Sequence, residues 1–127
     1  MTGNGRGRYL AETVATASPA RLVVMLYDRL ALDIVQGRDA LRAQQYSAAD
    51  ELLRHAQSII LELRSSLDVD MWEGAPRLAG IYGWIFKELV LANVNKDAER
   101  AEQCRELVEP LRETWHAAAA KLMAEAS

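Results

Sequence analysis

The sequence predicts an all-α protein, an antiparallel up-down four-helix bundle with a short N-terminal helical segment packed across it. Apolar residues recur at alternating intervals of three and four along four segments of roughly 20 to 28 residues. No segment alternates with a period of two, and the short links between segments favour antiparallel neighbours. With 127 residues, half of them apolar, the chain is long enough for one bundle domain over residues 9–127.

The N-terminal residues are predicted to be the least ordered part of the chain. Residues 1–8 contain three of the seven glycines and too little apolar area to hold one conformation, so we expect a mobile tail. Tyr9 and Leu10 then begin a short, weakly apolar piece of one or two helical turns.

The first long helix is predicted over residues 19–43. The Ser18 hydroxyl can accept a hydrogen bond from a free amide, and Pro19 suits the first helical position because its missing N–H has no partner there. The apolar period continues through Gly37, which costs a helix roughly 1 kcal/mol relative to alanine.

The second helix is predicted to begin at Ser47, with Asp50 in the position where a capping box prefers glutamate or glutamine. Its apolar seam is expected at Leu52, Ala56, Ile59, Leu63 and Leu67. A loop follows over residues 68–76, where a glycine and a proline interrupt the pattern and leave Trp72 without a helical stripe to join.

The third helix, predicted over residues 76–95, has more apolar surface than one helix face needs. Its core face is expected to hold Leu78, Tyr82, Ile85 and Leu89. The opposite side carries Gly80, Gly83, Trp84, Leu91 and Val94, with Lys87 among its few polar residues. A helix that is apolar on both sides must be covered on both sides, by its own molecule or by a partner.

Each feature of this second side has two interpretations. Trp84 and Leu91, one heptad apart, can line a groove for a partner or pack under the N-terminal piece. Gly80 and Gly83 can admit the backbone of a partner or be tolerated as poor helix formers. Asn93 lies beside the core face, where a buried amide needs a hydrogen bond, so it can bind a partner or complete an internal network.

Asp97 is predicted to cap the fourth helix, whose apolar stripe continues to Leu122. Pro110 interrupts this stripe and predicts a kink, because proline removes one backbone hydrogen bond and clashes with the preceding turn.

Composition excludes several classes of function. Fifteen basic against eighteen acidic residues, with no basic cluster, argue against nucleic-acid binding. No apolar run approaches the roughly 18 residues of a membrane-spanning helix, so we expect no membrane insertion. Cys104 is the only cysteine, so no internal disulfide can form, and we expect a cytoplasmic protein in which Cys104 is a small buried hydrophobic residue.

The sequence offers no convincing catalytic, cofactor or metal site. Glu113 and His116 form one Glu-x-x-His pair, the half-motif that di-iron carboxylate bundles use twice, but the second copy is missing. His55 has Glu51 four residues before it. We therefore expect solvated ion pairs, no metal and no enzyme activity.

Short motifs follow one another in order and spacing from the N-terminal piece to the fourth helix. They are Tyr9, Thr16-Ala17-Ser18-Pro19, Met25-Leu26-Tyr27-Asp28, Ala56-Gln57-Ser58-Ile59-Ile60-Leu61-Glu62-Leu63, Ser66-Leu67-Asp68, Tyr82, Leu89, Ala92-Asn93, Asp97 and Arg112-Glu113-Thr114-Trp115. Together they resemble the FliS family of flagellin-specific export chaperones.

This resemblance implies a bundle that binds the C-terminal segment of flagellin in the cytoplasm, prevents premature polymerisation and delivers flagellin to the flagellar type III export gate. It also implies that Tyr9 and Leu10 form a displaceable cover over the client site, with the early tyrosine tied to gate docking. Tyr27, Tyr82 and Asn93 are motif matches. Trp84 and Leu91 are inferred from the two-sided helix. An alternative is a structural module that has no flagellin client and pairs with its own copy as a homodimer. The chaperone itself can also form a homodimer when it is client-free.

The chain departs from the family pattern near the predicted groove. Gly83 and Trp84 stand where relatives often have aspartate and tyrosine, and Lys87-Glu88 replaces a common arginine pair. The glycine-rich loop of the family is represented here by Trp72-Glu73-Gly74-Ala75-Pro76.

Overall fold

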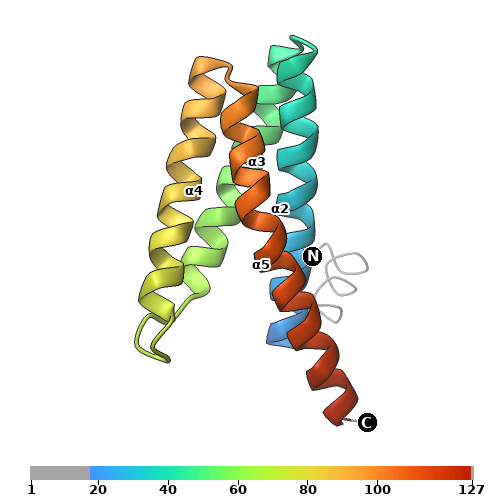
Figure 1. Cartoon of the computed structure of the whole chain (residues 1–127), viewed down its shortest axis with the longest axis vertical. Helices are drawn as coiled ribbons and strands as arrows, with labels where there is room; N and C mark the ends of the chain where they lie inside the picture. Colours follow the sequence, from blue (N-terminus) through green and yellow to red (C-terminus); the bar gives the residue numbers. More distant parts are fainter. Residues whose placement is uncertain (1–17, 127) are drawn as a thin grey trace, which may run out of the picture.

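A computed structural model describes residues 18–126 of the chain, and its secondary structure is helical. The four helices are α2 (Pro19–Arg42), α3 (Tyr46–Ser66), α4 (Ala75–Asn95) and α5 (Ala98–Ala126). Figure 1 shows them running alternately up and down, so the predicted all-α up-down bundle is confirmed. The predicted tail and the N-terminal piece with Tyr9 and Leu10 lie outside the described residues.

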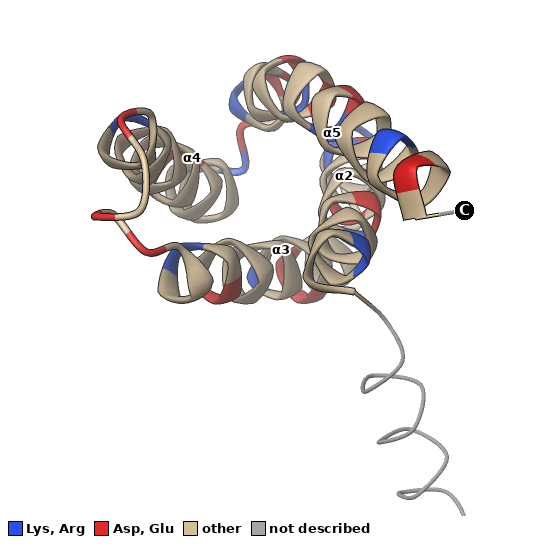
Figure 2. Ribbon diagram, turned by 90° about the horizontal axis from the view of Figure 1, so that it is seen from below, with Lys and Arg blue, Asp and Glu red and all other residues tan. Residues whose placement is uncertain are grey.

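The helices form a ring in chain order. In the end view of Figure 2, α4 lies opposite α2, and each helix packs mainly on its two neighbours in the ring. The contact of α2 with α3 and with α5 is the most extensive, whereas α4 and α5 touch least. Figure 1 shows α4 and α5 separating toward the end of the bundle where α4 begins, so the bundle is least closed there.

Two of the predicted helix starts are confirmed by their capping bonds. Ser18 Oγ accepts a hydrogen bond from the Arg21 backbone N–H at 3.1 Å, and Pro19 occupies the first turn. Asp97 Oδ1 accepts from the backbone N–H of Glu99 at 3.1 Å. In each case the side chain satisfies an amide that has no partner inside its helix.

The predicted start of the second helix at Ser47 is wrong. Helix α3 begins one residue earlier, at Tyr46, and the preceding Gln45 makes no capping bond through its side chain. The chain enters the helix early because Gln44 takes a left-handed conformation (φ 60°) and the Gln45 N–H bonds to the Ala40 carbonyl at 2.8 Å. Backbone bonds of the tight turn thus replace the capping box.

The buried face of α3 is rotated from the predicted seam. Leu52 and Leu67 are only partly buried, whereas Leu53 and Ile60, predicted on the flank, are 0% and 1% exposed. The rotation follows from the ring, because α3 must bury residues against α2 on one side and against α4 on the other.

Gly37 lies on the face of α2 that packs against α3. Its backbone is buried, and a Cβ atom built there would lie 2.7 Å from Leu53 Cδ2 and 3.0 Å from Leu53 Cγ. Leu53 is fully buried, so it has little room to move away. The close packing of α2 against α3 therefore requires glycine at position 37, because any side chain there would press on Leu53.

Replacing Gly37 by alanine is expected to lower the free energy of unfolding by about 1 kcal/mol, because overpacking against Leu53 outweighs the gain in helix propensity. Urea denaturation of the two proteins measures the difference. A double variant with Leu53→Val, which shortens the opposing side chain, should lose less than the two single changes summed. A more stable Gly37→Ala protein would contradict this account.

Helix α5 continues through Pro110 without a break. Figure 1 shows its second half turning away from α4, in agreement with the predicted kink. Thr114 Oγ1 donates to the Pro110 carbonyl at 2.8 Å, and such a bond is typical of bent helices. The bend contributes to the open end of the bundle between α4 and α5.

Candidate partner-binding surface

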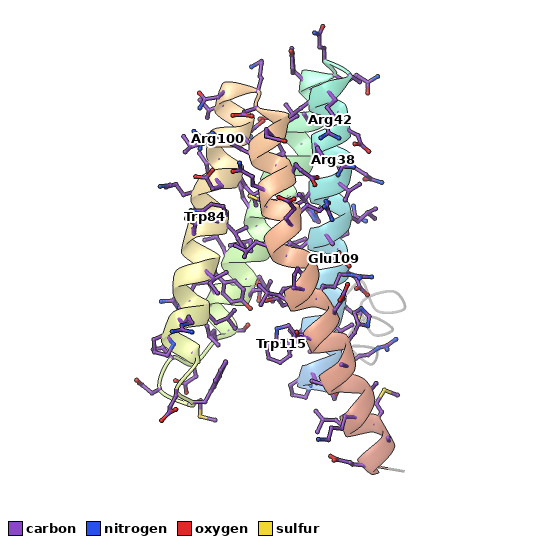
Figure 3. All side chains as sticks on the ribbon, viewed as in Figure 1. Arg38, Arg42, Trp84, Arg100, Glu109 and Trp115 are labelled. Atoms are coloured by element: carbon purple, nitrogen blue, oxygen red, sulfur yellow. The ribbon has the colours of Figure 1, made fainter. Side chains whose placement is uncertain are left out.

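The outer side of α4 carries a row of residues that no described helix covers. We call it the α4 stripe, and it consists of Gly80, Gly83, Trp84, Lys87, Leu91 and Val94. Trp84 is 41% and Val94 67% exposed, while Leu91 is half-buried. A Cβ atom at Gly80 or Gly83 would meet nothing within 4 Å, and Figure 3 shows Trp84 on α4.

Two polar contacts fix the rotation of α4 and therefore the direction in which the stripe faces. Glu88 Oε1 accepts from Arg100 Nη1 of α5 at 2.8 Å. On the other flank, Asn93 Nδ2 donates to Asp50 Oδ1 of α3 at 2.8 Å. The bonds to Asn93 and Arg54 hold the pKa of Asp50 below its usual range. Of the two interpretations of Asn93, the structure supports the internal network.

Tyr27 and Tyr82 lie inside the bundle, at 0% and 2% exposure. Their hydroxyl oxygens are 2.7 Å apart, which joins α2 to α4 across the ring. Burial raises the pKa of both phenols, most strongly that of Tyr27, where the bond to Tyr82 adds to the shift and the neighbouring Trp115 indole opposes it. Neither side chain faces a partner in this arrangement, so both support the fold beneath the surface.

A cavity of about 400 Å³ opens at the end of the bundle nearest the α3–α4 loop, and we call it the end cavity. Its lining includes Val23, Leu63, Leu78, Tyr82, Trp72 and Trp115. Figure 3 shows Trp115 pointing from α5 toward the space beside α4.

The sequence did not predict this cavity because its walls come from all four helices and one loop. The one signal was Trp72, a large apolar residue with no helical stripe to join.

The two histidines bind aspartates of α2, and neither uses the glutamate of its own helix. His116 Nε2 lies 2.6 Å from Asp28 Oδ1, and His55 Nδ1 bonds to the buried Asp33. Within residues 18–126 no group of three His, Cys, Asp or Glu side chains is arranged to hold a metal ion. The Glu-x-x-His pair therefore joins α5 to α2 through its histidine.

Cys104 is fully buried, and its thiol points to the Ile85 carbonyl, with 3.9 Å between sulfur and oxygen. Burial, with a contribution from the nearby Glu88 charge, raises the pKa of Cys104 to about 12. A thiol with so high a pKa is a poor nucleophile, in agreement with its predicted role as a small hydrophobic residue. No helix in the described part of the chain is apolar over a length that could cross a membrane.

An uncovered apolar face on a helical bundle is typical of proteins that bind other polypeptides. A family model described as "Flagellar protein FliS" matches residues 2–122. The chain therefore belongs to the FliS family.

Relatives of similar length support this assignment. The chain is 31% identical over 106 residues to the flagellar secretion chaperone FliS of Salmonella typhimurium, covering 82% of this chain and 78% of that protein. It is 28% identical over 107 residues to the FliS chaperone of Bacillus subtilis, covering 84% and 80%. A crystal structure of a bacterial flagellar chaperone matches the fold with a TM-score of 0.74 at 20% identity, over 95% of this chain and 99% of that one.

Proposed function

We propose that this protein is a cytoplasmic export chaperone that binds the C-terminal segment of flagellin, prevents its premature polymerisation and delivers it to the flagellar type III export gate. The observation that carries the proposal is the exposed α4 stripe on a chain of the FliS family. A disordered client tail can fold as an amphipathic helix along this stripe and cover it.

The stripe suits a helical client. Gly80, Trp84, Leu91 and Val94 follow the helical repeat, so they present one continuous line to a helix lying alongside. Trp84 offers the largest apolar area, and aromatic residues of this kind dominate binding energy at interfaces. Lys87 lies within the line, so the client face is expected to place a carboxylate or carbonyl oxygen opposite it.

Trp84→Ala is expected to weaken binding of a flagellin C-terminal peptide by about tenfold to a hundredfold, as loss of a central aromatic contact does. Isothermal titration calorimetry measures the affinity and the expected 1:1 stoichiometry. The stability loss should be smaller than the affinity loss, because 41% of the side chain is exposed in the free protein. Leu32→Ala, on α2 across the ring and 44% exposed, is the matched control and should bind normally. Unchanged peptide affinity in Trp84→Ala, or a stability loss as large as the affinity loss, would remove Trp84 from the site.

Substitution of the two stripe glycines tests whether a client backbone approaches α4 closely there or whether the helix merely tolerates the glycines. Gly80→Ala and Gly83→Ala should each stabilise the free protein by up to about 1 kcal/mol, because the added methyl group meets open space and favours the helix. If a client backbone approaches there, the same changes should weaken peptide binding. Thermal unfolding and peptide titration of the same variants give both values. Full affinity in both variants would assign the glycines no role in binding.

The same stripe can pair with its copy on a second molecule, which is the homodimer alternative. Sedimentation with and without the flagellin peptide separates the two functions: a client-free chaperone dimer should split when the peptide is added, whereas a structural dimer should persist.

Tyr9 and Leu10 remain proposed as a displaceable cover over the client site, with Tyr9 also contacting the export gate. The double variant Tyr9→Ala/Leu10→Ala should then bind the flagellin peptide more tightly, while export of flagellin is lost.

A further inference from the structure

We propose that the end cavity is a second docking site, which takes a bulky apolar side chain from a helix of a partner protein whose flanking residues are basic. The cavity and the α4 stripe share no residue. The inference therefore does not depend on which client occupies the stripe.

The size and the apolar mouth of the end cavity favour a bulky apolar side chain as its occupant. The cavity volume of about 400 Å³ lies in the range of ligand-binding pockets, roughly 300 to 1,000 Å³. Met71 and Trp72 stand at the mouth and are 74% and 51% exposed. Leaving two large apolar side chains in water is unfavourable, and a partner side chain that covers them gains that apolar area.

Trp72 is held in place by its own loop. A Cβ atom at position 74 would lie 1.9 Å from Trp72 Cζ3, so the indole ring packs over the loop only because residue 74 is glycine. The loop is further fixed by hydrogen bonds from the Met71 N–H to the Asp68 carbonyl and from the Ala75 N–H to the Trp72 carbonyl, both at 3.1 Å. A wall that is already ordered costs a partner little entropy on binding.

The charge around the mouth identifies the partner's flanks. Residues 68–77 contain the acids Asp68, Asp70 and Glu73 against one basic residue, Arg77. Figure 2 shows these acidic positions along the link between α3 and α4. Among residues 18–126, the three carboxylates form no ion pair. Lysine or arginine beside the inserted apolar side chain would complement them, and acidic flanks would be repelled.

Two synthetic helical peptides test the proposal on the full chain. Both carry the same leucine and phenylalanine stripe, and they differ only in lysine or glutamate at the flanking positions. Calorimetry should show the lysine peptide binding at least about tenfold more tightly at low salt, with the gap narrowing at high salt. The triple variant Asp68→Asn/Asp70→Asn/Glu73→Gln should bind the two peptides alike.

Trp72→Ala and Met71→Ala should each weaken binding of the lysine peptide by about tenfold. Met71→Ala should leave the melting temperature unchanged, because that side chain is 74% exposed, so it separates lost binding from the loop packing that Trp72→Ala also removes. Trp84→Ala is the control and should bind this peptide normally. Equal binding of the two peptides, normal binding by Trp72→Ala, or loss of binding in Trp84→Ala would each overturn the proposal. Two other outcomes would overturn it. Peptide binding that requires removal of residues 1–17 would assign the cavity to this chain's own segment. A dimer that Trp72→Ala dissociates would assign the cavity to a second copy of the chain.

Discussion

Arg100→Met is expected to lower the free energy of unfolding by about 3 kcal/mol, because it leaves a buried carboxylate without its cation. Glu88 on α4 is only 6% exposed, and its Oε1 lies 2.8 Å from Arg100 Nη1 on α5. The protein cannot return Glu88 to water without separating the two helices. Urea denaturation followed by circular dichroism measures the loss.

The control is the double variant Glu88→Met/Arg100→Met, in which neither charge remains. Replacing a buried ion pair by apolar side chains of similar size is often neutral or stabilising, so the double variant should recover most of the lost stability. Equal losses in the single and double variants would show that packing by the Arg100 stem, and not the unpaired Glu88 charge, is what matters.

The pair also matters for binding. Glu88 lies one turn from both Trp84 and Leu91, so its bond to Arg100 holds the α4 stripe in its outward orientation. The single Arg100→Met variant is therefore expected to lose affinity for the flagellin peptide as well as stability.

Tyr82→Phe is expected to cost about 2 kcal/mol of stability, since it removes the hydrogen-bond partner of the fully buried Tyr27 hydroxyl. Desolvation of an unpaired hydroxyl is the main cost, because the ring itself is kept. Thermal and urea unfolding give the change, and the end cavity, which Tyr82 lines, should keep its apolar walls.

A double-mutant cycle isolates this bond. Tyr27→Phe/Tyr82→Phe removes both hydroxyls and should be more stable than Tyr82→Phe, because no buried hydroxyl is then left unpaired. Strictly additive losses in the cycle would mean that the 2.7 Å contact contributes no coupling energy.

Local chemistry explains why the helices were predictable. Ser18 and Asp97 cap the helices they were expected to cap, because an N-cap needs only a side-chain oxygen and nearby amides. The excess apolar surface of the third helix also followed from its residue period, and the structure leaves Trp84 and Val94 exposed as that excess implies. These are properties of neighbours along the chain.

Partners distant in the sequence were not predictable. His55 was expected in a solvated ion pair, with Glu51 four residues before it on the same helix, but it binds Asp33 of α2. Asn93 had two interpretations, and only the packing of α3 places Asp50 beside it. Tyr27 and Tyr82 were matched to a partner site, yet the bundle buries them against each other.

The sequence by itself determined the four helices, their order and the surplus apolar side of the third helix, because helix formation and amphipathicity depend on residues three and four apart. Only the tertiary structure decided which surfaces stay open. The rotation of α4, fixed by Glu88 and Asn93, turns the stripe outward. The end cavity exists because four helices and one loop meet there without filling the space, and no one-dimensional period encodes how well distant side chains fit together.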